Sequence, residues 1–148
     1  MSLLGLDVGT TGTKGVAFDI EGKPIASAYR EYPLLSPKPG WQELEPEHVW
    51  RCVREVLGEV AQKTKHDPIR AMAMSAQGEA VLAVDKTGAV LTNSPVTFDA
   101  RTADIPAWWL ERKSRMELAQ ISGMPLHGMY SLNKILWLKQ NQPEIFSK

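Results

Sequence analysis

The residues best suited to chemistry lie near the start of the chain, around a turn rich in glycine and threonine. In order they are Asp7, Gly9, Thr10, Thr11, Gly12, Thr13 and Lys14. Glycines allow the backbone to come close to a phosphate group and turn successive N–H groups toward it. Threonine hydroxyls add neutral donors, and a lysine adds a positive charge. The stretch therefore predicts a turn that binds phosphate.

Asp7, just before the turn, is the candidate metal ligand. Magnesium prefers few carboxylates and several waters, so a single aspartate beside a phosphate can hold it through water. Lys14, just after the turn, would neutralise the charge of a phosphoryl group during transfer. An ordinary glycine-rich hairpin with an incidental acid is the alternative. The coincidence of these residue types at one turn favours the phosphate interpretation.

The turn differs from a Walker loop. The spacing from Gly9 to Lys14 is shorter than that motif requires, and Val16 to Phe18 reads as a strand where a Walker loop leads into a helix. Apolar runs on both sides predict two strands joined by the turn, and 23–32 predicts a third. The three strands should form an antiparallel meander.

The remaining chain alternates apolar runs with turn signals. Apolar residues at helical spacing predict a helix from Pro46 that ends at 65–68, followed by a strand over 69–75 at the centre of the sheet. A hairpin is expected from 80–84 and 89–91. The further expected elements are a strand over 95–98, a helix over 106–113, a helix opened by a capping box at Ser114–Glu117 and closed by Gly123, and a helix capped by Ser131.

A second set of polar residues follows the predicted strand over 69–75. Gln77, Gly78 and Glu79 would lie at its carboxyl end, where open α/β sheets bind ligands. Glu79 can accept hydrogen bonds from two neighbouring hydroxyls, and Gln77 can donate and accept. These residues predict a sugar-binding loop, and a solvated loop with a glycine turn is the alternative.

Asp99 and Arg101 form a third candidate pair. They could brace a cleft as a structural ion pair or bind substrate hydroxyls, and the sequence favours neither interpretation. Trp41 is expected to pack rather than to stack on a sugar.

Composition narrows the class of protein. The chain has 148 residues, with 17 basic and 17 acidic side chains, so it offers no basic field for nucleic acid. Its apolar runs are too short to span a membrane. Cys52 is the only cysteine, which excludes an internal disulfide and suits a cytoplasmic location. Three histidines show no metal-ligand spacing.

The chain resembles the FGGY carbohydrate kinases in five segments that occur in the same order. No segment after the first is specific alone, but their order is. They are 5–14 at the phosphate turn, 40–43 with the following Pro46, 75–79 at the predicted sugar loop, 98–101, and 134–146.

The resemblance implies an α/β fold of ribonuclease-H-like type, as in the actin-like ATPase superfamily, with a mixed sheet, an antiparallel three-strand meander and flanking helices. It implies ATP and Mg²⁺ as cofactors, a sugar or polyol as substrate, and a homodimer as one expectation. Asp7 and Lys14 would be catalytic, the turn would bind ATP phosphates, and Gln77, Gly78, Glu79, Asp99 and Arg101 would bind substrate.

The family architecture implies that residues 1–148 are an incomplete N-terminal domain. The catalytic aspartate and the nucleotide-binding C-terminal domain would lie beyond residue 148, so the chain alone is expected to be inactive. An actin-like ATPase that needs no sugar and a non-catalytic binding module are the two rival interpretations.

Departures from the family bear on the substrate. Glycerol kinases carry arginine where Gly78 stands and a substrate-contacting tyrosine where Met129 stands, which counts against glycerol. Xylulose and gluconate kinases typically carry Met-His where this chain has Gly78 and Glu79. The carboxylate of Glu79 disfavours an anionic substrate unless Arg101 compensates its charge, so a neutral ketose or polyol is expected.

Overall fold

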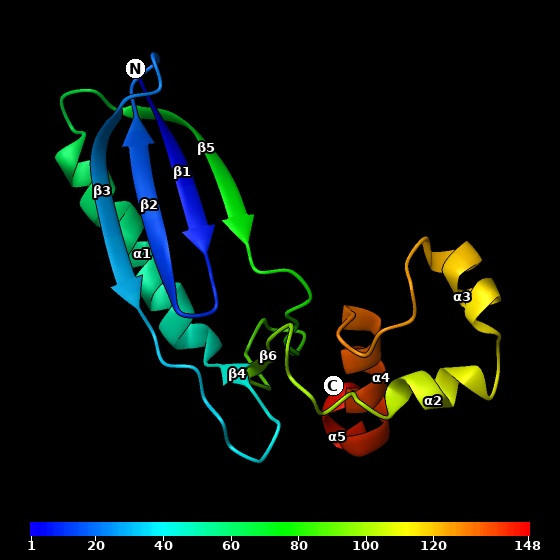
Figure 1. Ribbon diagram of the computed structural model, residues 1–148. Coiled ribbons are helices and arrows are strands. Elements are labelled where there is room, and N and C mark those ends of the chain that lie inside the picture. The colour runs from blue at the N-terminus through cyan, green and yellow to red at the C-terminus, as the bar shows by residue number, and fades with distance from the viewer. The chain divides into compact units, whose positions relative to one another are not determined.

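The computed structural model describes all 148 residues, which form two compact units (Figure 1). The first unit comprises 1–34 and 44–78, and the second comprises 35–43 and 79–148. Each unit therefore consists of two chain segments, with boundaries after Leu34, Glu43 and Gly78. The predicted phosphate turn belongs to the first unit, and the pair Asp99 and Arg101 belongs to the second.

The first unit is built on a four-stranded mixed sheet. Its strand order is β3-β2-β1-β5, with β1–β2 and β2–β3 antiparallel and β5 parallel to β1. The strands are β1 (Ser2–Val8), β2 (Gly12–Phe18), β3 (Pro24–Glu31) and β5 (Ile69–Ala76). This arrangement confirms the predicted meander and the mixed sheet.

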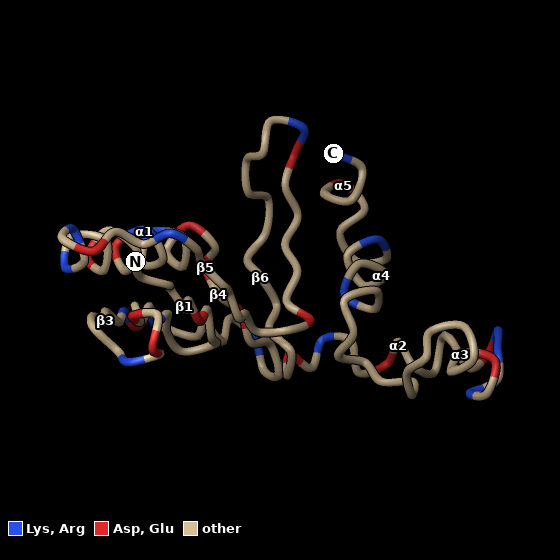
Figure 2. Tube along the Cα trace, turned by 90° about the horizontal axis from the view of Figure 1, so that it is seen from above, with Lys and Arg blue, Asp and Glu red and all other residues tan.

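One long helix, α1 (Pro46–Lys63), covers the meander on one face, as Figure 1 shows. Its buried valines, including Val56 and Val60, pack against Leu4 and Leu6 of β1. The predicted helix is confirmed, and its periodic apolar face forms the core of this unit. Acidic and basic residues are interspersed along α1 (Figure 2), as expected for a helix with one solvated face.

Two glycines offer a matched test of this packing. A Cβ at Gly15 would lie 2.8 Å from Val56 Cγ1 and 3.4 Å from Val60 Cγ2, whereas a Cβ at Gly58 would meet nothing within 4 Å. We expect Gly15→Ala to lower the free energy of unfolding by about 1–3 kcal/mol through overpacking. Gly58→Ala, inside α1, should raise it by about 0.5–1 kcal/mol. Urea titration of both variants checks this, and equal effects would contradict the close packing of β2 on α1.

β5 lies at the edge of the sheet, which corrects the prediction of a central strand. Its residues are largely exposed, with Met72 at 54% and Met74 at 66%. The apolar run is typical of a parallel strand that is covered on both faces. Here α1 packs on β2 and β3 and leaves β5 uncovered.

The second unit is mainly helical. The capping box at Ser114 is present with both hydrogen bonds, and Gly123 ends the same helix with a left-handed φ of 72°. None of the chain's helices has the length and apolar character needed to cross a membrane. The remaining elements of the chain are the short strand β4 (Glu43–Leu44), whose two residues belong to different units, the short strand β6 (Ser94–Pro95), and the helices α2 (Ile105–Leu110), α3 (Arg115–Ser122), α4 (Ser131–Asn141) and α5 (Pro143–Phe146).

Three local predictions for this unit are corrected in part or in full. The hairpin at 80–91 is confirmed in reduced form, because Val84 and Val90 form an antiparallel bridge around the predicted turn held by Asp85, but the two flanking runs are not regular strands. The strand over 95–98 is reduced to β6, which is two residues long. Ser131 is the first helical residue of α4 rather than its cap, because Tyr130 occupies the capping position.

Candidate functional site

The predicted phosphate turn joins β1 to β2 and has Asp7 and Lys14 at its base. These two residues are directly opposite each other in the antiparallel register, so their side chains project from the same face of the sheet. Both side chains are exposed. An aspartate and a lysine side chain therefore leave the same face of the sheet next to the turn, where a phosphate and its metal ion could be bound together.

The turn itself is tied down by backbone and side-chain hydrogen bonds. The N–H of Gly9 donates to the carbonyl of Gly12 at 2.9 Å, and the Tyr32 hydroxyl donates to the carbonyl of Gly9 at 2.7 Å. The N–H of Tyr32 donates to the carbonyl of Thr11 at 3.2 Å. Burial raises the pKa of Tyr32 to about 12, so its hydroxyl stays protonated and continues to donate. A preformed turn loses less entropy when it binds a ligand.

Some residues of the turn hold the hairpin together, and others are accessible to a ligand. Thr13 is fully buried, and its hydroxyl donates to the Asp7 carbonyl at 2.8 Å, so this hydroxyl serves the hairpin. Gly12 is required for packing, because a Cβ there would lie 2.7 Å from the backbone carbonyl oxygen of Arg30. Thr10 is half-buried and Thr11 is exposed, so these two threonines are the ones available to a ligand.

A bound magnesium ion fits this end of the sheet. No group of three or more His, Cys, Asp or Glu side chains in the chain could hold a metal. Magnesium does not need such a cluster, because it is commonly held by one or two carboxylates together with phosphate oxygens and water. Asp7 lines a shallow groove of about 370 Å³ with Lys14 and Ser75. The donor set therefore suits a water-mediated contact from Asp7.

Gln77 continues the edge of the sheet beside the phosphate turn. Its N–H donates to the carbonyl of Val8 at 2.9 Å, which places it just beyond the carboxyl ends of β1 and β5. Its side-chain oxygen Oε1 is buried and has no hydrogen-bond partner. An unpaired buried amide oxygen is unfavourable, so Gln77 is suited to accept a hydrogen bond from a ligand.

Glu79 begins the second unit and has an unusual backbone. Its φ of 58° makes it the only residue other than glycine with a positive φ. Its Oε2 accepts from the Ser131 N–H and from the Ser131 hydroxyl, the latter at 2.8 Å. The Lys134 ammonium donates to the Glu79 carbonyl. Sequence reasoning missed both partners, because they lie 52 and 55 residues further along the chain.

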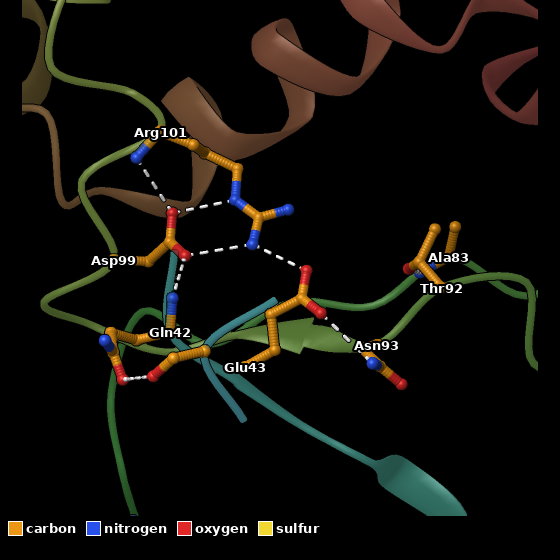
Figure 3. A network of polar contacts seen from close by, with 8 residues as sticks. Gln42, Glu43, Ala83, Thr92, Asn93, Asp99 and Arg101 are labelled. Carbon is orange, nitrogen blue, oxygen red and sulfur yellow. Dashed lines mark hydrogen bonds and ion pairs between the residues drawn. The ribbon is translucent and has the colours of Figure 1, made fainter. Parts of the chain in front are cut away.

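Asp99 and Arg101 form part of a buried network with Glu43 (Figure 3). Arg101 Nε lies 2.7 Å from Asp99 Oδ1, and Arg101 Nη2 lies 2.6 Å from Glu43 Oε1. The Gln42 N–H donates to Asp99 Oδ2 at 2.6 Å, and the Asn93 amide donates to Glu43 Oε2 at 3.1 Å. The side chains of Arg101 and Asp99 are 5% and 0% exposed.

The residues around this network keep Asp99 and Arg101 charged although both side chains are buried. Burial opposes ionisation of Asp99, but hydrogen bonds from Arg101 and Gln42 outweigh it and lower the pKa of Asp99 below its usual 3.8. The guanidinium carbon of Arg101 also lies 3.9 Å from the ring centroid of Trp41. Trp41 packs edge-on against Trp137, as its predicted packing role requires.

The geometry separates the two interpretations of the Asp99–Arg101 pair. Asp99 is enclosed and fully occupied by protein donors, which favours the structural ion pair for this residue. Arg101 and Glu43 also line a cavity of about 510 Å³ with Trp41 and Trp137. Contact between Arg101 and a ligand therefore stays a prediction. Sequence reasoning missed Glu43, although its position in the segment 40–43 was a signal.

Residues 2–148 match the FGGY family of carbohydrate kinases, N-terminal domain. A glycerol kinase from Aquifex aeolicus (strain VF5) is 34% identical over 140 residues, which cover 94% of this chain and 28% of that protein. A gluconate kinase and a ligand-bound xylulose kinase from Lactobacillus acidophilus are each 35% identical, with TM-scores of 0.90 and 0.91.

Each of these two matches covers 99% of this chain but only 30% of the solved kinase. The chain therefore spans less than a third of the length of these relatives. They are sugar kinases of the actin-like ATPase fold, and this confirms the predicted α/β fold of ribonuclease-H-like type. The chain accordingly belongs to the FGGY family of carbohydrate kinases and lies within the N-terminal domain of that family.

Proposed function

We propose that the protein containing this chain transfers a phosphoryl group from ATP to a hydroxyl group of a neutral sugar or polyol. The observation that carries the proposal is the phosphate turn, where Asp7 and Lys14 stand opposite each other beside a tied-down glycine backbone. The family match supports the same chemistry, because the glycerol, xylulose and gluconate kinases that resemble the chain are phosphotransferases.

The proposed phosphate end of the site uses a small set of residues. Thr10 and Thr11 would bind phosphate oxygens through N–H and O–H groups, and Lys14 would neutralise charge on the group in transfer. Asp7 would hold Mg²⁺ through water, and the ion would supply charge neutralisation at the phosphates. Phosphoryl transfer depends mainly on alignment and charge stabilisation, so these contacts would be the chain's contribution to the rate.

The proposed sugar end begins with Gln77 and Glu79. The unpaired Oε1 of Gln77 would accept a hydrogen bond from a hydroxyl, and the Glu79 carboxylate would do the same. A carboxylate accepts but does not donate, so it favours a substrate rich in hydroxyls over an anionic one. Gly78 has no side chain, and a Cβ there would meet nothing within 4 Å, which supports a substrate larger than glycerol.

Further parts of the site are proposed to come from polypeptide outside residues 1–148. The chain spans 28% of the Aquifex glycerol kinase, and we propose that the catalytic aspartate and the adenine site lie in the part that it does not cover. We expect the 148-residue chain alone to release no sugar-dependent ADP. A cytoplasmic location is part of the proposal, supported by the single unpaired Cys52.

The test is ADP release by the full-length protein with a panel of ketoses, aldoses, polyols and aldonates, each with and without Mg²⁺. A strong magnesium-dependent response to one neutral sugar or polyol is the expected result. Equal ADP release without any sugar would replace the proposal with an actin-like ATPase. Absence of turnover with every compound would replace it with a non-catalytic binding module.

A further inference from the structure

Glu79 is held by the first turn of α4 in a way that no local sequence rule requires. Its carboxylate accepts two hydrogen bonds from Ser131, and its carbonyl accepts one from Lys134. Both hydrogen bonds to the carboxylate use Oε2, and neither uses Oε1. The side chain is therefore fixed through one oxygen while the other lies outside these bonds.

The backbone of Glu79 needs such support. A positive φ is unfavourable for a residue with a side chain and persists only where surrounding structure holds it. The hydrogen bond from Lys134 to the Glu79 carbonyl constrains the peptide that follows this φ. Glycine would adopt the same backbone without strain, so the backbone does not explain a glutamate at this position, and a role for its carboxylate does.

Lys134 is an unusual donor for a hydrogen bond that holds the Glu79 carbonyl, because its side chain is buried. It is 2% exposed, and burial lowers the pKa of Lys134 although the charges of Asp99 and Glu79 oppose that change. The only charged residues of α4 are lysines, the basic positions along this helix in Figure 2. Burying an ammonium group is costly, so a contact that merely filled space would be better made by an apolar side chain.

We propose that Ser131 and Lys134 are positioning residues that hold Glu79 so that Oε1 accepts a hydrogen bond from a hydroxyl of a neutral sugar. This inference rests on the proposed function and deepens it, because it says how the sugar contact is kept in place. Neither residue needs to touch the sugar. Their effect passes through Glu79, and that dependence can be measured.

The test is a double-mutant cycle in the full-length protein. We expect Lys134→Met to raise the KM for the sugar about tenfold, roughly the value of one hydrogen bond that involves a charged group, with kcat and the KM for ATP changed less than about twofold. In a Glu79→Ala background, the same substitution should change the sugar KM less than about twofold, because the residue it positions is gone. Ser131→Ala should follow the same pattern with a smaller effect, since the Ser131 N–H bond remains.

Lys139→Met is the matched control, because Lys139 is exposed on the same helix. It should leave the sugar KM unchanged. An equal rise in KM for Lys134→Met with and without Glu79 would overturn the inference and leave Lys134 a structural residue. An unchanged KM for Lys134→Met would overturn it as well.

Hydrogen–deuterium exchange tests whether α4 anchors Glu79 without requiring that the protein phosphorylate a sugar. Lys134→Met should speed exchange of the amides around Glu79, and Lys139→Met should not. If the unsubstituted protein phosphorylates no sugar, the proposed function fails, yet this exchange still reports whether α4 anchors Glu79. Unchanged exchange in Lys134→Met would overturn the anchoring.

Discussion

Asp7→Ala in the full-length protein is expected to lower kcat for sugar phosphorylation by about 10²–10³-fold, the typical cost of one preorganised electrostatic contact. The Asp7 side chain is exposed, while the hairpin bond at this position uses the Asp7 carbonyl, which alanine retains. The substitution should therefore remove the metal contact and leave the turn folded. Steady-state ADP release measured across a magnesium titration checks this, and the variant should need more Mg²⁺ to reach half its maximal rate.

Glu21→Gln is the control for Asp7→Ala, because Glu21 is an exposed acid in the turn between β2 and β3. Its activity and magnesium dependence should match those of the unsubstituted protein. Circular dichroism and the urea midpoint should be the same for both variants. Full activity in Asp7→Ala would contradict the metal role and leave the phosphate turn to act through Lys14 and its backbone.

Arg101→Met is expected to lower the free energy of unfolding by about 3–5 kcal/mol, the usual cost of removing one partner of a buried ion pair. Asp99 and Glu43 would be left as buried carboxylates without their shared cation. Methionine has a similar volume, so packing against Trp41 is largely kept and the loss reports the charge. Urea unfolding followed by tryptophan fluorescence checks this, because Trp41 lies against the guanidinium group.

Arg112→Met is the matched control for this loss. Arg112 pairs with Glu111, and both side chains are exposed, at 46% and 71%. An exposed ion pair typically contributes about 0–1 kcal/mol, so this variant should unfold close to the unsubstituted protein. Equal urea midpoints for Arg101→Met and the unsubstituted protein would show that the network does not stabilise the second unit.

The pH dependence of the Arg101→Met effect follows from the lowered pKa of Asp99. Its stabilising contribution is complete above the unfolded pKa near 3.8 and is lost as the pH falls through the lower folded value. In the variant, acid relieves the unpaired carboxylates by protonating them. The difference in unfolding free energy between the two proteins should therefore be largest near neutral pH and shrink as the pH falls, because the unpaired carboxylates of the variant are protonated before those of the intact ion pair. A difference that stays constant with pH would contradict the role of Asp99.

Local sequence patterns correctly predicted the elements whose conformation depends on residues close together in the chain. The glycine turn with its two strands, the helix from Pro46 and the capping box at Ser114 all have the predicted positions. Each of these depends on contacts within a few residues or on a repeating apolar face, which the sequence displays directly. The family was predicted at the same level, from five short segments in order, and the match over residues 2–148 confirms the membership.

Only the tertiary structure decided which polar side chains are partners. Glu43 meets Arg101 across 58 residues, and Ser131 and Lys134 reach Glu79 across 52 and 55 residues. Such pairs depend on how the chain packs, and hydrogen-bonding side chains carry no periodic signal that names a distant partner. The same reason explains why β5 was predicted as a central strand. Its apolar residues predict burial on both faces. Whether another element covers those faces depends on how the chain packs and not on the sequence of the strand.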